Sequence, residues 1–82
     1  MKLTNNIWST RMSSHHTYKK IEMVGSSQTS IEDAIKNALS ECNKTVRNMD
    51  WFEVVETRGH IVDGGVGHFQ VTLKIGFRLE GS

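Results

Sequence analysis

Trp51 is the residue of this sequence best suited to contact a ligand. It opens a strand-like run in which successive side chains alternate between two faces, so its indole lies on the face opposite Phe52 and Val54. If those two residues join an apolar core, the indole stands on the polar face. A large aromatic side chain on a polar face usually has a partner. The run itself leaves open whether that partner is a ligand or another subunit, or whether Trp51 is simply a well-tolerated aromatic at the edge of the sheet.

A predicted hairpin relates Trp51 to further polar side chains. Asp-Gly-Gly between two β-rich runs indicates a turn centred near Gly64. The resulting register places Arg58 opposite Gln70, His60 opposite His68, and Trp51 opposite Phe77. Trp51 and Gln70 then lie on the order of 24 Å apart along the hairpin, at ~3.4 Å per residue. A bulge near Gly59 would change this register. In the simple register, a site that uses both side chains must be built between subunits.

The other reactive side chains do not form a convincing catalytic or metal site. His60 and His68 could share a metal ion as cross-strand neighbours, but no carboxylate or thiolate is fixed beside them, which favours solvated histidines and no metal. Cys42 falls on an apolar stripe, where a cysteine is usually a small core residue. Glu53 and Glu56 fall on opposite faces by strict alternation, so they make a poor acid–base pair.

Three strands are expected to position these residues. Ile21 and Met23 alternate with charged neighbours and predict a strand over residues 17–25, which Gly25 ends. The runs 51–61 and 68–80 form the two arms of the hairpin. In the second arm the alternation predicts one apolar face, made of Phe69, Val71, Leu73, Ile75, Phe77 and Leu79.

A single helix is expected between the first strand and the hairpin. Thr29 with Glu32 and Ser30 with Asp33 match the capping-box pattern at its start. Apolar steps of three and four residues predict a core-facing stripe, with the helix ending near Asn48. The stripe contains Ile31, Ala34, Ile35, Ala38, Leu39, Cys42, Val46 and Met49. The order β-α-β-β predicts an α+β fold, with a three-stranded antiparallel sheet partly wrapped around one helix.

Length, charge and cysteine usage narrow the class of protein. A chain of 82 residues holds one domain and buries only roughly 60% of its unfolded surface, which favours self-association. A net charge of +1 argues against a nucleic-acid partner, and no apolar run approaches the ~18 residues needed to cross a membrane. One cysteine without a disulfide partner suits the cytoplasm. Residues 1–16 lack periodicity and predict a flexible arm that is either added to the natural chain or upstream of a second start at Met12.

Four segments together resemble the dodecin family over residues 17–80. They are YKKIEMVG from Tyr18, TSIEDAIKNAL from Thr29, DWFEVVETRGHI from Asp50 and FQVTLKIGFRLE from Phe69. The resemblance implies a β-α-β-β protomer and a hollow homo-dodecamer with flavin sites at two-fold contacts. It implies that Trp51 stacks on the isoalloxazine ring, that Gln70 hydrogen-bonds the ring edge and that Arg58 reaches flavin or its phosphate. Arg78 is a weaker candidate for phosphate or subunit contacts.

This resemblance predicts a binding protein and not an enzyme. Its function would be to store flavin and protect it from light, with FMN the preferred cofactor and riboflavin or FAD as alternatives. A carrier of coenzyme A or another nucleotide-like ligand is a second possibility, and a flavin-dependent oxidoreductase is a third. Single-stranded nucleic acid could also stack on Trp51, but the near-neutral charge argues against it.

Overall fold

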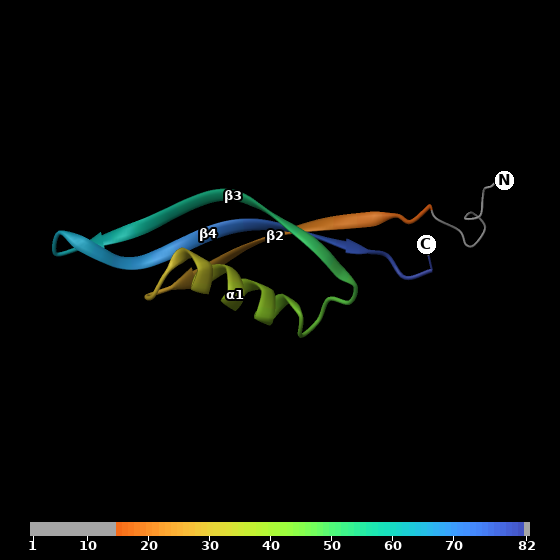
Figure 1. The fold of residues 1–82 in the computed structure, drawn as a ribbon, viewed down its shortest axis with the longest axis horizontal. Helices are drawn as coiled ribbons and strands as arrows, with labels where there is room; N and C mark the ends of the chain where they lie inside the picture. The colour runs from red at the N-terminus through yellow and green to blue at the C-terminus, as the bar shows by residue number, and fades with distance from the viewer. Residues whose placement is uncertain (1–14, 82) are drawn as a thin grey trace.

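The computed structural model describes residues 15–81, which form one helix and a three-stranded sheet (Figure 1). The elements follow the order β2 (Tyr18–Ser27), α1 (Ile31–Cys42), β3 (Met49–Val62) and β4 (Gly65–Arg78). All strand pairs are antiparallel, and the strand order is β2-β4-β3. The predicted β-α-β-β fold is confirmed. Of the predicted arm over residues 1–16, only His15 and His16 belong to the described residues.

Helix α1 begins at the predicted cap but ends earlier than the sequence suggested. Ser30 is the N-cap, and its side chain accepts a hydrogen bond of 2.9 Å from the backbone N–H of Asp33. The prediction that the helix ends near Asn48 is wrong, because it ends at Cys42. The backbone N–H of Thr45 donates to the carbonyl of Cys42 at 3.1 Å, which tightens the last turn and turns the chain away. Asn48 then adopts a positive φ of 64°, which no helix can include.

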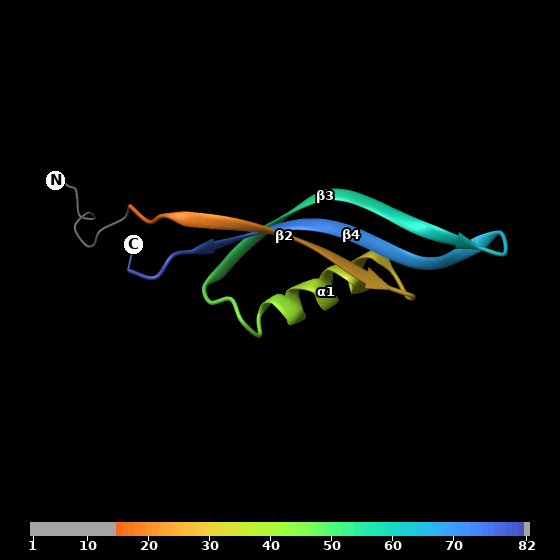
Figure 2. The same cartoon turned by 180° about the vertical axis from the view of Figure 1, so that it is seen from behind.

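The core lies between α1 and the two strands that it covers, β2 and β4 (Figure 2). Small side chains on the helix let it approach the sheet closely, and branched side chains from β4 fill the space between them. The fully enclosed residues are Ala34, Ala38, Cys42, Val71, Leu73 and Ile75. Val46 and Met49 also pack against this core, although they lie beyond the helix end. The predicted apolar stripe is therefore confirmed by its contacts.

Strand β3 lies at the sheet edge farthest from the helix axis, and its apolar side chains are not enclosed (Figure 1). Phe52 pairs with Ile75 and Val54 with Leu73, so both lie on the helix side of the sheet, as expected. They nevertheless remain 44% and 46% exposed. They lie on the helix side without joining the core of a single chain, because α1 packs mainly on β2 and β4.

The hairpin between β3 and β4 turns at Asp63 and Gly64. Both residues have positive φ, 51° and 78°, as a two-residue type I′ turn requires, and Asp-Gly is one of the sequences that adopt it. Arg58 pairs with Gln70 and His60 with His68, as predicted. Irregular pairing at Asp50, Val55 and Gly67 shifts the rest of the register.

No helix within the described residues 15–81 is long and apolar enough to cross a membrane.

The close approach of α1 to β2 at Gly25 gives a stability prediction. A Cβ atom at this position would overlap the carbonyl oxygen of Ala34 and lie 2.8 Å from the Cβ of Ala38. Gly25→Ala should therefore lower the free energy of unfolding by about 1 to 3 kcal/mol, because the helix must shift. Denaturant unfolding at fixed protein concentration measures this. Gly65→Ala is the matched control, since its Cβ would meet only the Val62 carbonyl oxygen at 3.8 Å. Equal stability of the two variants would contradict the prediction.

Candidate functional site

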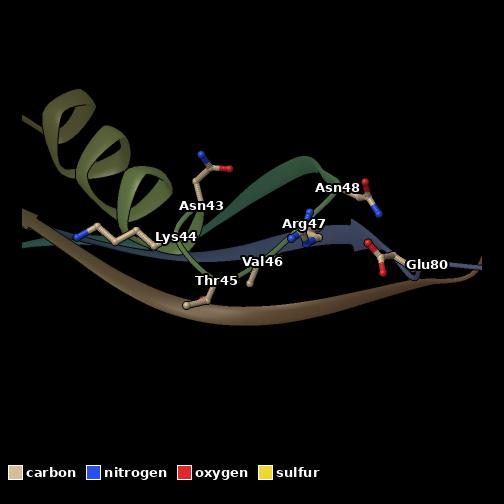
Figure 3. A pocket seen from close by; sticks show the side chains of 7 residues that line it. All are labelled: Asn43, Lys44, Thr45, Val46, Arg47, Asn48 and Glu80. Atoms are coloured by element: carbon tan, nitrogen blue, oxygen red, sulfur yellow. The ribbon is translucent and has the colours of Figure 1, made fainter.

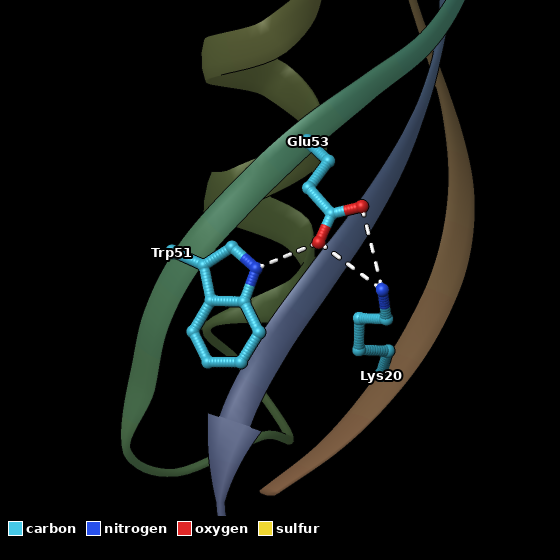
Figure 4. A network of polar contacts seen from close by, with 3 residues as sticks. All are labelled: Lys20, Trp51 and Glu53. Carbon is cyan, nitrogen blue, oxygen red and sulfur yellow. Dashed lines mark hydrogen bonds and ion pairs between the residues drawn. The ribbon is translucent and has the colours of Figure 1, made fainter.

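Trp51 lies on the open face of the sheet, opposite the helix, and its ring covers Gly76 of β4 (Figure 4). The predicted pairing of Trp51 with Phe77 is wrong by one residue, because Val55 is left out of the regular ladder. A methyl group at Gly76 would collide with the six-membered ring of the indole. The absence of a side chain at Gly76 therefore lets the indole lie close to the sheet, and 39% of Trp51 stays exposed.

Polar and aromatic neighbours surround the indole on this face. Its Nε1–H donates to Oε2 of Glu53 at 3.0 Å. Lys20, on β2, donates to both carboxylate oxygens of Glu53 at 3.1 and 3.4 Å (Figure 4). Tyr18 meets the indole edge to face, with ring centroids 5.3 Å apart. All three strands therefore contribute to the surroundings of Trp51.

The hydrogen bonds to Glu53 also favour the ionised form of its carboxyl group. The hydrogen bond from Trp51, and after it the one from Lys20, lower the pKa of the Glu53 carboxyl below its ordinary value. Lys74, paired with Glu53 across the ladder, acts in the same direction through its charge. Glu53 is therefore anionic at neutral pH and acts as an acceptor, so it is unsuited to be a general acid.

An apolar hollow opens at the β3 edge of the sheet, mainly on the helix side. It is lined by Leu39, Met49, Asp50, Trp51, Phe52 and Ile75 and has a volume of about 190 Å³. Sites that enclose a drug-sized ligand usually measure roughly 300 to 1,000 Å³. One chain therefore offers only part of a site for such a ligand.

The predicted site residues form two separate groups. Arg58 and Gln70 are direct cross-strand partners on the face that carries Trp51. Gln70 is six positions along β4 from Gly76, the partner of Trp51, which corresponds to ~20 Å. This is slightly shorter than the sequence suggested, but Trp51 and Gln70 of one chain still cannot contact the same small molecule.

Arg78 belongs to the group at the Trp51 end of the sheet. It pairs with Tyr18, the residue whose ring contacts the indole, and lies two positions beyond Gly76 on the same strand. Its backbone N–H donates to the carbonyl of Asn48 at 3.1 Å, and its own carbonyl accepts from the Asn48 side chain at 3.3 Å. These contacts fix the backbone of Arg78 and leave its guanidinium exposed.

The structure gives little support to a metal site at the histidine pair or to a nucleophilic role for the cysteine. The rings of His60 and His68 lie edge to face with centroids 6.2 Å apart, but residues 15–81 contain no group of three or more side chains able to hold a metal ion. Burial raises the pKa of the Cys42 thiol, which opposes the thiolate form that a nucleophile needs.

Glu53 and Glu56 share one face of the sheet, contrary to the prediction from strict alternation. They pair with Lys74 and Thr72, which lie two positions apart on β4. The unpaired Val55 between them advances the alternation by one residue and brings Glu56 to the open face. Glu53 remains engaged with Trp51 and Lys20, so the shared face does not create an acid–base pair.

A second hollow, which the sequence did not predict, follows the end of α1 (Figure 3). It has a volume of about 540 Å³ and is lined mainly by polar side chains: Asn43, Lys44, Thr45, Val46, Arg47, Asn48 and Glu80. Lys44 and Arg47 line it from the segment that follows the helix end. No sequence signal reveals this hollow, because it depends on the early helix end and on the left-handed backbone of Asn48.

The fold and this face define a class of protein: a small α+β sheet protein with an exposed aromatic side chain on the open face of its sheet. The sequence model of the family described as Dodecin matches residues 17–80. This chain therefore belongs to the dodecin family.

Individual relatives agree with this assignment. The dodecin of Thermus thermophilus is 54% identical over 63 residues, which cover 77% of this chain and 91% of that protein. The structure of dodecin from Streptomyces coelicolor has a TM-score of 0.80 and 51% identity, covering 84% of this chain and 99% of its own. Dodecin from Streptomyces davaonensis has a TM-score of 0.79 and 48% identity, covering 82% and 98%.

The packing of the indole on Gly76 can be tested directly. Gly76→Ala should displace the Trp51 ring from the sheet and shift its fluorescence emission to longer wavelength, because the ring becomes more hydrated. The measurement uses a Trp8→Phe background, so that Trp51 is the emitting tryptophan. Gly65→Ala again provides the control. An unchanged emission maximum in the Gly76 variant would show that the ring does not depend on the space above this glycine.

Proposed function

We propose that this chain binds flavin at contacts between subunits of a hollow homo-dodecamer, and that it stores flavin and protects it from light. FMN is the preferred ligand, with riboflavin and FAD as alternatives. The observation that carries the proposal is the Trp51 indole, which is held over Gly76 on the open face of the sheet with part of its surface exposed. Such a ring offers a stacking surface for an isoalloxazine. Family membership supports the same ligand.

Other residues are suited to complete the site from a second chain. Stacking on an aromatic side chain contributes about 1 to 3 kcal/mol per ring, by analogy with nucleic-acid bases. The Gln70 amide both donates and accepts hydrogen bonds, which matches the uracil-like edge of flavin. Arg58, its cross-strand partner, carries the positive charge that a phosphate or an electron-rich ring edge would attract. Arg78 is assigned to phosphate or subunit contacts.

Self-association follows from the surface that α1 leaves uncovered. Phe52 and Val54 project from the helix side of β3 and are close to half exposed. An exposed apolar strip of this kind is typical of a subunit interface. The separation of Trp51 from Gln70 within one chain points in the same direction, since only an assembled oligomer can bring both to one ligand.

We propose storage without catalytic turnover. The carboxylate nearest the indole, Glu53, is engaged by Trp51 and Lys20, and Cys42 is enclosed in the core. Stacked tryptophan quenches excited flavin by electron transfer, which would protect both flavin and protein. The buried unpaired Cys42 also suits the reducing cytoplasm, where we propose that the protein acts.

Flavin titration tests the proposed function. Light scattering gives the mass of the assembly, and flavin fluorescence follows binding of FMN or riboflavin. We expect a dodecamer that quenches about one flavin per chain, and we expect Trp51→Ala to lose the quenching because stacking is lost. Trp8→Ala is the control for removal of a tryptophan. A monomer or dimer that leaves flavin fluorescence unchanged would overturn the proposal.

Mixing of inactive variants tests whether each site spans two chains. Trp51→Ala and Gln70→Ala should each bind flavin poorly as pure oligomers. Unfolding and refolding them together in equal amounts should restore about a quarter of the sites, because a random pair then joins an intact Trp51 to an intact Gln70 from its partner. If mixed oligomers of the correct mass regain no flavin binding, Trp51 and Gln70 of each site come from the same chain. That result would contradict the inter-subunit arrangement.

A further inference from the structure

The strand β2 contributes a charged side chain to the surroundings of Trp51, although none of the residues assigned to the ligand lies on this strand. Lys20 pairs with Gly76, and Trp51 pairs with the same glycine from the other side. Lys20 therefore reaches across the central strand β4 to Glu53 on β3, as Figure 4 shows. Gly76 provides no side chain that would block this path. One glycine thus accommodates both the indole and the crossing lysine.

The contacts of Glu53 connect this lysine to the indole. Oε2 of Glu53 accepts from the indole Nε1–H at 3.0 Å and from Lys20 Nζ at 3.1 Å. The indole has one N–H donor, so this hydrogen bond fixes the rotation of the ring about its own axis. Lys20 in turn restrains the carboxylate. The three residues form a chain of contacts that runs across the whole sheet.

We infer that Lys20 and Glu53 are positioning residues, which hold the Trp51 ring in the orientation that a flat aromatic ligand requires before that ligand arrives. This inference rests on the proposed function. Ordering a side chain on binding lowers affinity by about two- to tenfold, and a ring that is already held avoids that loss. The clamp formed by Lys20, Glu53 and Trp51 therefore acts on affinity through the indole, without contact between Lys20 and the ligand.

Four variants and one control test this role, with uncharged riboflavin as the probe. Lys20→Met and Glu53→Ala should weaken riboflavin binding by about two- to tenfold and change the near-UV circular dichroism of Trp51 in the free protein. Glu53→Gln keeps an acceptor for the indole and should retain more affinity than Glu53→Ala. Lys20→Arg keeps the ion pair and should bind like the parent protein. Lys44→Met is the control, because it removes another exposed ion pair of 3.1 Å, with Glu41.

The pH dependence of riboflavin affinity is a second measurement, which a purely structural role of Lys20 and Glu53 would not change. The charged groups facing Glu53 are Lys20 on β2 and Lys74 on β4, with Glu22 of β2 paired to Lys74. Because the pKa of Glu53 is lowered, the clamp should persist as the pH falls through the ordinary glutamate range near ~4.3 and open only below it. Riboflavin affinity should decline over that lower range in the parent protein and stay flat in Glu53→Gln.

The outcomes separate the two proposals. If the parent protein binds riboflavin and both Lys20→Met and Glu53→Ala bind it equally well, the clamp is refuted and the flavin site stands. If the parent protein binds no flavin, the proposed function fails and the positioning role fails with it. Light scattering shows that each variant keeps the parent mass. Should Glu53→Ala not assemble, Lys20→Met and Glu53→Gln decide the question.

Discussion

The placement of α1 over β2 and β4, and not over β3, is the constraint on which the rest of the structure depends. A single helix of 12 residues encloses Val71, Leu73 and Ile75 on the central strand but leaves Phe52 and Val54 exposed at the edge. A chain this small cannot enclose both sides of its outer strand from its own residues. Association with further chains would cover this apolar surface, and we propose that the ligand site lies at the same contacts.

Two glycines and one ion pair shape the two faces of the sheet. Gly25 allows the helix to approach the sheet, and Gly76 allows the indole of Trp51 to lie on it. Lys20 and Glu53, which are 33 residues apart in the chain, meet across the central strand and hold the indole N–H. Exposed ion pairs contribute little to folding stability in general. We infer that the ion pair of Lys20 and Glu53 instead orients the Trp51 ring.

Much of the fold and part of the site could be predicted from the sequence. The cap at Ser30, the apolar stripe on the helix and the Asp-Gly turn depend on neighbours within a few residues, so their patterns are readable locally. The pairing of Arg58 with Gln70 was predicted correctly because two differences cancel. The turn lies at Asp63 and Gly64, half a residue earlier than the predicted centre, and the bulge at Gly67 restores the predicted register. The pairing of Trp51 was missed by one residue, since a bulge leaves no reliable mark in a sequence of alternating side chains.

The sequence by itself determined the element order, the apolar face of β4, the location of the hairpin turn and the resemblance to dodecins, because each rests on local periodicity or on motif residues. The tertiary structure alone decided that β3 stays exposed, that Glu53 and Glu56 share a face and that Trp51 lies over Gly76. It also decided that Lys20 reaches Glu53. These features depend on where bulges fall and on which strand a helix covers, and both are settled by the packing of the whole chain.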